Sequence, residues 1–254
     1  MHLALERSGR GPTLVLIHGI TEQSEIWRPL IGPLSEHFDV IALDLRGHGR
    51  SPKGDTYDPV SLATDVHETI AELGIERPLV VGHSLGGVVA SAYAVVGRPR
   101  AVVNVDQPLR LAGFQDALRQ LEPMLRGDPA TFAGAIDMLF DSMMGPLPSD
   151  EAARVKALRR PDQDVVLGVW DVVLDSTADE LDAVVQGLVG GITVPYLSLH
   201  GIDPGEDYTS WLRAAIPSAT VEVWPDQGHY PHLVQPDRFV ERIVDFDRFD
   251  PRPV

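Results

Sequence analysis

Cysteine is absent from the 254 residues of this chain. Without cysteine there can be no disulfide framework, no thiolate metal site and no cysteine nucleophile. Any covalent chemistry must therefore come from serine, histidine or carboxylate side chains, and nine histidines are present.

Long hydrophobic runs and a basic charge balance are also missing. No apolar run approaches the length that is needed to cross a bilayer, and the opening residues lack the basic region, apolar core and cleavage site of a secretory signal. The formal net charge of -16 disfavours nucleic acids, because a nucleic-acid binder needs a basic face. We expect a cytoplasmic protein with a small-molecule substrate and with no membrane or nucleic-acid partner, and we leave its oligomeric state open.

Internal repeats, low-complexity segments and a linker long enough to separate independent domains are lacking as well. A chain of this length can bury one sizeable core, and α/β architectures of this size commonly form one unit. We therefore predict a single folding unit, which can carry an insertion.

Strand-like and helix-like runs alternate through the first 106 residues. The strand-like runs are almost continuously apolar, which is typical of parallel strands buried on both faces, and the segments between them have helical spacing. This pattern predicts an α/β fold with a mostly parallel sheet that helices cover on both faces. The predicted strands are 13–19, 38–47, 78–82 and 100–106, and the predicted helices are 24–36, 61–74 and 86–97.

The alternation stops after Asp106 and resumes near Gly191, with only helical patterns between them. These predicted helices are 113–125, 128–144, 149–160, 163–174 and 178–190. Two strands, 193–201 and 220–225, and two helices, 207–216 and 236–249, complete the prediction. We predict an α/β core formed by 1–107 and 191–254, with 108–190 inserted as a helical cap.

One motif carries a candidate nucleophile. The run Gly82 to Gly86, G-H-S-L-G, places Ser84 directly after a predicted strand and before a predicted helix. This is the context of a nucleophile elbow, in which the serine stands on a strained turn and the glycines let strand and helix approach closely. We interpret Ser84 as the nucleophile, and the alternative is an inert serine in a tight turn.

In these features the chain resembles the α/β-hydrolase family over nearly its whole length. The resemblance rests on the elbow together with LIHG at 16–19, DLRGHGRS at 44–51 and GH at 228–229, in that order. It implies that the backbone N–H groups of Ile20 and Leu85 form an oxyanion hole. Such fixed donors stabilise the negative charge that develops during acyl transfer.

The serine needs a base, and the resemblance implies His229, which follows the last predicted strand. His232 is an alternative base three residues further on. The resemblance gives structural positions to His18, His48 and His83.

The acid that orients His229 has two leading candidates. The resemblance favours Asp203, in the loop after the strand at 193–201, although family members usually carry this aspartate one position later. Some members carry the acid after the preceding sheet strand, which here is Asp106. The minor alternatives are Asp207 and Glu206.

A serine, an acid and a histidine in this order predict acyl transfer. Ser84 would attack a carbonyl carbon while His229 takes its proton, and the acid would hold the imidazole in the productive tautomer. This chemistry requires no metal and no organic cofactor. Ser84 also separates the chain from the dehalogenases and epoxide hydrolases of the family, which need a carboxylate nucleophile at this position.

The predicted cap is rich in methionine and aromatic residues, which can form an adaptable apolar pocket. We expect Met138, Met143 and Trp170 of the cap, and Trp27 after the oxyanion loop, to contact the substrate. We expect the arginines of the cap to be solvated. The cap therefore predicts a small to medium, partly apolar ester or lactone as the substrate.

Two other functions stay open at this point. A carbon–carbon bond hydrolase would use the same three residues and the same oxyanion hole. A ligand-binding receptor or signalling protein could keep the fold with slow turnover or none, because a fold does not by itself determine a function.

Overall fold

A seven-stranded sheet forms the centre of the computed structural model, which describes residues 1–248. The strand order is β1-β3-β2-β4-β5-β6-β7. The strands are β1 (Leu5–Gly9), β2 (Thr13–Ile17), β3 (Asp39–Leu43), β4 (Leu79–His83), β5 (Ala101–Val105), β6 (Tyr196–His200) and β7 (Ala219–Val223). All neighbours are parallel except β1 and β3, which are antiparallel. The predicted mostly parallel α/β sheet is confirmed.

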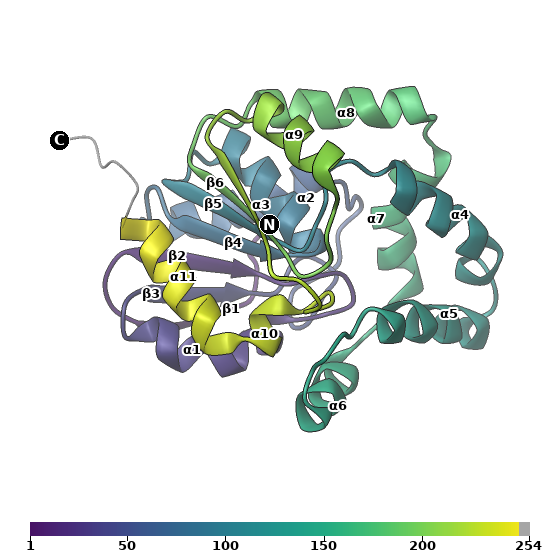
Figure 1. The fold of residues 1–254 in the computed structure, drawn as a ribbon. Helices are drawn as coiled ribbons and strands as arrows, with labels where there is room; N and C mark the ends of the chain where they lie inside the picture. The colour runs from purple at the N-terminus through teal and green to yellow at the C-terminus, as the bar shows by residue number, and fades with distance from the viewer. Residues whose placement is uncertain (249–254) are drawn as a thin grey trace.

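Helices cover the sheet on both faces, as predicted. They are α1 (Arg28–Ser35), α2 (Pro59–Glu72), α3 (Leu85–Val96), α9 (Glu206–Ala215) and α11 (Pro236–Arg248). In β2, Val15 and Ile17 belong to the core shared with α2, α3 and α9, whereas Leu14 and Leu16 belong to the core shared with α1 and α11 (Figure 1). Successive strand residues point to opposite faces, so an uninterrupted apolar strand supplies two cores.

The start of α2 differs from the predicted one. Its N-cap is Asp58, whose carboxylate accepts hydrogen bonds from the backbone N–H groups of Val60 and Ser61 at 3.1 and 3.0 Å. Ser61, the first residue of the predicted helix, therefore lies inside the first turn of α2. Pro59 fits before it, because the first helical residue needs no N–H donor.

Three short elements are not predicted by the sequence pattern. They are β1, the 3-10 helix η1 (Ser24–Trp27) and the short helix α10 (Pro231–Val234). β1 is mostly exposed and is held by backbone pairing with β3, in which Leu5 lies opposite Leu43. A strand held mainly by its backbone has no apolar alternation to reveal it. Because η1 precedes α1, the helix predicted at 24–36 is two elements.

Five helices connect β5 to β6, all within the predicted insertion. They are α4 (Ala112–Leu125), α5 (Pro129–Ser142), α6 (Ser149–Leu158), α7 (Gln163–Asp175) and α8 (Ala178–Gly190). In Figure 1, α4 to α7 lie beside the sheet, and α8 runs back toward α9. We call residues 108–190 the cap segment. The predicted core segment 191–254 and the predicted helix 236–249 extend beyond the described residues, so 249–254 are not described.

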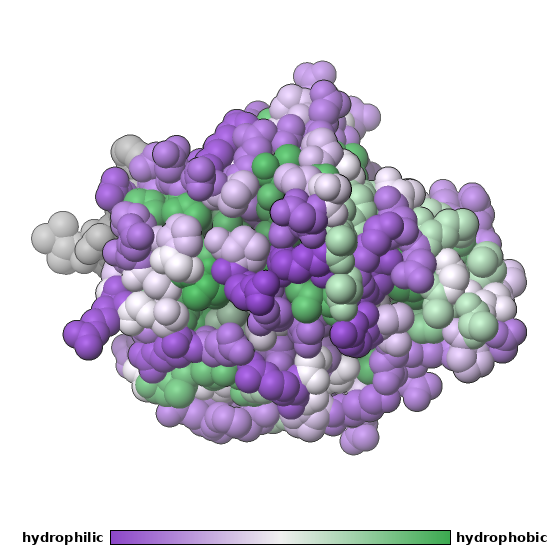
Figure 2. Space-filling view, turned by 90° about the horizontal axis from the view of Figure 1, so that it is seen from below, coloured by the Kyte–Doolittle hydropathy of each residue, from purple (hydrophilic) through white to green (hydrophobic). Residues whose placement is uncertain are grey.

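Hydrophilic side chains cover most of the face shown in Figure 2, with smaller hydrophobic groups between them. Within residues 1–248, no helix is long and apolar enough to span a membrane.

Candidate active site

Ser84 lies at the sharp junction between β4 and α3. Its backbone has φ 53° and ψ -123°, which is strained for a residue with a side chain. A Cβ added to Gly82 would lie 1.9 Å from the Gly86 carbonyl oxygen, and one added to Gly86 would lie 2.2 Å from the Ile17 oxygen. Both positions therefore require glycine, as the elbow interpretation predicts.

The elbow directs Ser84 toward a cavity. The Ser84 N–H donates a hydrogen bond to the carbonyl oxygen of Val105 at 3.0 Å, which anchors the turn to the end of β5. Leu85 is the first residue of α3, so its N–H has no acceptor within the helix. Ser84, Leu85 and Ile20 all line the same cavity.

His229 makes its side-chain hydrogen bond to Asp106. The two residues are joined by a bond of 2.7 Å between His229 Nδ1 and Asp106 Oδ2. The other oxygen, Asp106 Oδ1, accepts hydrogen bonds from the N–H groups of Gly201 at 2.7 Å and Ile202 at 3.1 Å. Burial opposes ionisation of Asp106, but the hydrogen bond and charge of His229 and these two N–H donors hold its pKa below the usual range.

The second ring nitrogen of His229 is left free for chemistry. An ionised carboxylate only accepts hydrogen bonds, so Nδ1 of His229 carries the proton toward Asp106, and Nε2 of the neutral ring is an acceptor. Nε2 is buried and has no hydrogen-bond partner among the residues that the structure describes. Both His229 and Ser84 line the cavity.

The structure corrects the preferred partner of His229 from Asp203 to Asp106. Asp203 is exposed, and its carboxylate accepts a hydrogen bond from the N–H of Gly205 at 2.9 Å, which is a local turn contact. Parallel pairing of β5 with β6 places the end of β5 beside the loop after β6. The loop after β6 therefore contacts Asp106, which directly follows β5, through the N–H groups of Gly201 and Ile202. The minor candidates Glu206 and Asp207 lie exposed in the first turn of α9.

The loop after β2 is held by two buried side chains. His18 Nδ1 donates to the carbonyl oxygen of Gly19 at 2.7 Å, and His18 Nε2 accepts from the N–H of Leu45 at 3.0 Å. The N–H of Gly19 donates to Glu22 Oε2 at 2.8 Å. These contacts fix the loop that carries Ile20 to the cavity.

Glu22 and His83 form a buried ion pair that the sequence analysis does not identify. His83 Nδ1 lies 3.3 Å from Glu22 Oε2, and His83 Nε2 donates to the carbonyl oxygen of His229 at 2.8 Å. Both ring nitrogens thus face acceptors, an arrangement that only the imidazolium satisfies. The pair connects the loop after β2, the elbow and the backbone of His229.

The pKa shifts agree with this charge state. Burial alone would raise the pKa of Glu22, but the charge of His83, with hydrogen bonds from His83 and the Gly19 N–H, lowers it to about 2. Burial alone would lower the pKa of His83, but the charge of Glu22 and its hydrogen bond outweigh burial and raise that pKa. The signal that could have found this pair is a glutamate three residues after the glycine of the HG turn.

The alternative base, His232, does not line the cavity. Its ring is fully buried against Trp27, with 4.9 Å between ring centroids, and burial lowers its pKa well below the usual value. Trp27 itself is fully buried in the core beneath α1 and α11. The predicted substrate contact of Trp27 is therefore wrong, because this residue, at the end of η1, packs its indole into the core.

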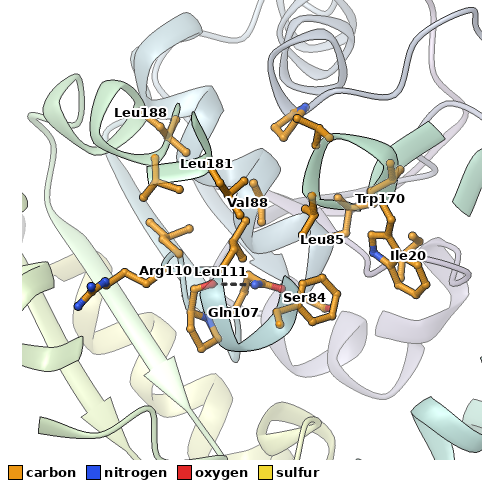
Figure 3. Close-up of a pocket in the computed structure, with 18 of the residues that line it drawn as sticks. Ile20, Ser84, Leu85, Val88, Gln107, Arg110, Leu111, Trp170, Leu181 and Leu188 are labelled. Carbon is orange, nitrogen blue, oxygen red and sulfur yellow. Dashed lines mark hydrogen bonds between the residues drawn. The ribbon is translucent and has the colours of Figure 1, made fainter. Parts of the chain in front are cut away.

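A cavity of about 780 Å³ lies between the elbow and the cap segment. Met143 and Trp170, both predicted substrate contacts, line it. Met138 does not line it, and 53% of its surface is exposed, so that prediction is wrong. Met138 lies on the solvent side of α5, whereas Phe140 lines the cavity. Figure 3 shows Trp170 and Ile20 on one side of Ser84 and Leu188 at the other end.

Metal ligands are not gathered at this site. Within residues 1–248, no group of three or more His, Asp or Glu side chains is placed to hold a metal ion. The polar side chains that line the cavity near Ser84 include those of His229, Asp106 and Gln107.

This fold is that of an α/β hydrolase. The model of the alpha/beta hydrolase family matches residues 14–242, which is most of the chain. The chain therefore belongs to this family.

Curated relatives match nearly the whole chain, among them a hydrolase and an esterase. A 2-(acetamidomethylene)succinate hydrolase from Mesorhizobium japonicum is 29% identical over 258 residues, covering 96% of this chain and 91% of the relative. A pimeloyl-acyl-carrier-protein methyl ester esterase from Pectobacterium atrosepticum is 27% identical over 257 residues, covering 95% and 96%. Among solved structures, Est816, an N-acyl homoserine lactone degrading enzyme, aligns with a TM-score of 0.80 and 23% identity over 96% of both chains. At this identity the structural likeness shows the fold alone.

Proposed function

We propose that this protein is a serine hydrolase that cleaves a partly apolar ester or lactone through an acyl-enzyme on Ser84. One observation carries the proposal. His229 binds Asp106 through Nδ1 at 2.7 Å and keeps a buried, unpartnered Nε2 on the cavity that Ser84 also lines. A base oriented in this way is what a weakly nucleophilic hydroxyl requires.

The first half-reaction transfers the acyl group to the enzyme. Ser84 Oγ attacks the carbonyl carbon as its proton passes to His229 Nε2, and the carbonyl oxygen becomes negative. The backbone N–H groups of Ile20 and Leu85 would stabilise that oxygen. Collapse of the tetrahedral intermediate breaks the bond to the leaving alcohol, which takes the proton from His229.

The second half-reaction frees the enzyme. His229 Nε2 takes a proton from water, the resulting hydroxide attacks the acyl carbon, and the bond to Ser84 Oγ breaks as Oγ recovers the proton. The products are a carboxylic acid and an alcohol, or one hydroxy acid from a lactone. Asp106 stays ionised throughout, because the N–H groups of Gly201 and Ile202 and the ring of His229 all favour its charge.

The relatives support the hydrolase class and leave the bond type to experiment. The esterase from Pectobacterium atrosepticum is named for a methyl ester, and the hydrolase from Mesorhizobium japonicum is named for a different substrate. The apolar cavity near Ser84 is compatible with the partly apolar ester or lactone that we propose.

A fluorophosphonate probe tests the proposal directly. The wild-type protein should gain the mass of the probe on Ser84, and Ser84→Ala should not, with both proteins folded by circular dichroism. Hydrolysis of chromogenic esters, lactones and diketones then assigns the bond that is cleaved. Folded wild-type protein that resists the probe and turns over none of these compounds would favour the receptor function instead.

A further inference from the structure

The cavity above Ser84 extends well beyond the nucleophile. One stripe of α3, formed by Leu85, Val88, Ala92 and Val95, lines the cavity from the elbow to the end of the helix. These residues are three or four positions apart, so they lie on one face of α3. The ten-residue step from Leu85 to Val95 corresponds to about 15 Å of helix.

A second helix forms the opposite wall. Leu181, Val185 and Leu188 of α8 also line the cavity, again at a spacing of three or four residues. Figure 3 shows Leu181 close to Val88 and Leu188 farther from Ser84, so the two helices border the cavity along its length. The result is an elongated apolar space, which we call the α3–α8 channel, defined by these α3 and α8 residues.

Charged side chains that line the cavity are already occupied or turned away. The carboxylate of Asp106 binds His229, and Asp58 caps α2. The carboxylate of Asp203 is exposed in its own turn. Arg110 is exposed, its guanidinium lies 5.7 Å from the centre of a tryptophan ring, and Figure 3 shows it directed away from the channel. A charged group inside the channel would therefore lose its hydration without gaining a partner.

The two ends of the channel differ in exposure. Leu85 is 7% exposed beside the nucleophile, whereas Val95 at the far end of α3 is 46% exposed. Val184 of α8, which also lines the cavity, is 59% exposed. Between the ends, Ala92 has the smallest side chain of the α3 stripe and is 1% exposed. The channel is thus buried at Ser84 and open toward solvent at its other end.

We propose that the substrate carries an unbranched, uncharged aliphatic chain of roughly ten to twelve carbons, which lies in the α3–α8 channel, the length following from the helix span. This inference rests on the proposed serine hydrolase function and assigns its substrate class. A linear chain fits because the walls are two nearly continuous rows of aliphatic side chains. The open end accepts chains that are longer than the channel.

The first test is a chain-length series measured as kcat/KM. One arm uses p-nitrophenyl esters of linear acids and the other uses acetate esters of linear alcohols, from about two to about fourteen carbons. In at least one arm kcat/KM should rise by up to roughly fourfold for each buried methylene and level off near ten to twelve carbons. A flat or falling profile in both arms would overturn the channel.

Two substitutions by phenylalanine obstruct the α3–α8 channel at different distances from Ser84. Val88→Phe lies one turn from the nucleophile and Ala92→Phe lies two turns away, so Val88→Phe should shift the chain-length optimum to shorter esters than Ala92→Phe does. The ratio of kcat/KM for the decanoyl ester to that for the butanoyl ester should fall at least roughly tenfold in both variants. Ala130→Phe is the matched control, because it is exposed on α5, does not line the cavity and should leave the profile unchanged.

A third variant tests the channel even if the two phenylalanine variants fail to fold. Val95→Asp puts a charge on the half-exposed far end of the channel, so it should lower kcat/KM for the dodecanoyl ester severalfold more than for the hexanoyl ester. Equal effects on both esters would contradict the proposal. Labelling by the fluorophosphonate probe separates failure of this inference from failure of the proposed function. Labelled protein with a flat chain-length profile would contradict only the aliphatic-chain substrate. Folded protein that is not labelled would contradict the serine hydrolase function.

Discussion

The end of the sheet that carries Ser84 and the cap segment that covers it are built differently. Below the cavity, the buried residues Glu22, His83, Asp106 and His229 are polar and joined by hydrogen bonds. In the cap segment the buried polar residues are Gln115 and Arg159, and neither lines the cavity.

The two polar residues of the cap segment serve its own helices. The Gln115 amide donates to the carbonyl oxygens of Val173 at 2.6 Å and Ser176 at 2.9 Å, which ties α4 to the end of α7. Arg159 pairs with the carboxylates of Asp137 and Asp141 on α5. At the end of the sheet, buried hydrogen bonds thus fix the positions of the polar side chains. The cap segment borders the cavity with apolar side chains, which have no fixed polar partners and can adapt to an apolar group.

The largest expected effect comes from the acid. Asp106→Asn should lower kcat roughly 10⁴-fold, because the amide no longer favours the proton on Nδ1 of His229. Asp203→Asn is the matched control and should stay within about threefold of wild type, since Asp203 only closes an exposed turn. Steady-state kinetics on a short chromogenic ester measures both, and comparable losses in the two variants would refute the assignment of Asp106.

The buried ion pair should give the next largest effect. Glu22→Gln removes the charge that the His83 imidazolium requires, so it should destabilise the protein by about 3–5 kcal/mol in urea unfolding. Because the pair also supports the loop of Ile20 and the backbone of His229, kcat should fall roughly 10- to 100-fold with little change in KM.

The matched double variant sharpens that result. His83→Asn with Glu22→Gln removes both charges and should be less destabilised than the sum of the two single variants. Simple additivity would show that the two side chains do not act as a pair.

The cap segment should respond differently, through binding. Trp170→Ala removes a large wall of the cavity and should raise KM roughly tenfold while kcat stays within about threefold. Met138→Ala is the control from the solvent side of α5 and should leave both constants unchanged. If Trp170→Ala lowered kcat as much as Asp106→Asn does, the cap segment would not act mainly through binding.

The last expected effect is on the acid stability of the protein. Because the folded-state pKa of Glu22 is about 2, below its ordinary value of 4.5, its charge stabilises the fold above pH 4.5 and loses that effect as the pH falls toward 2. The difference in unfolding free energy between wild type and Glu22→Gln should therefore shrink across this range. Urea unfolding at several pH values measures it, and a constant difference would show that Glu22 is not ionised in the fold.

Much of the fold was predictable because its signals are local. The parallel strands are short apolar runs, and the elbow needs Gly82 and Gly86 within two positions of Ser84. The edge strand β1 was not predictable in this way, since backbone pairing with β3 holds it and its side chains are mostly exposed.

The candidate site was predictable to a smaller extent. Ser84 and His229 follow from their motifs, and the structure brings both to one cavity. The choice between Asp106 and Asp203 depends on β5 lying beside β6, a pairing between segments that are about ninety residues apart in sequence.

Local sequence was enough to indicate the fold class and the elbow around Ser84, because the apolar strand pattern and the elbow glycines depend on steric requirements within a few residues. Tertiary structure alone decided the partner of His229, the Glu22–His83 pair and which residues line the cavity. Each of these depends on which side chains meet across the sheet or beneath the cap segment. Trp27 and Met138 illustrate the reason, because both are residue types that often line apolar pockets. The packing of their elements places Trp27 in the core and Met138 on the solvent side.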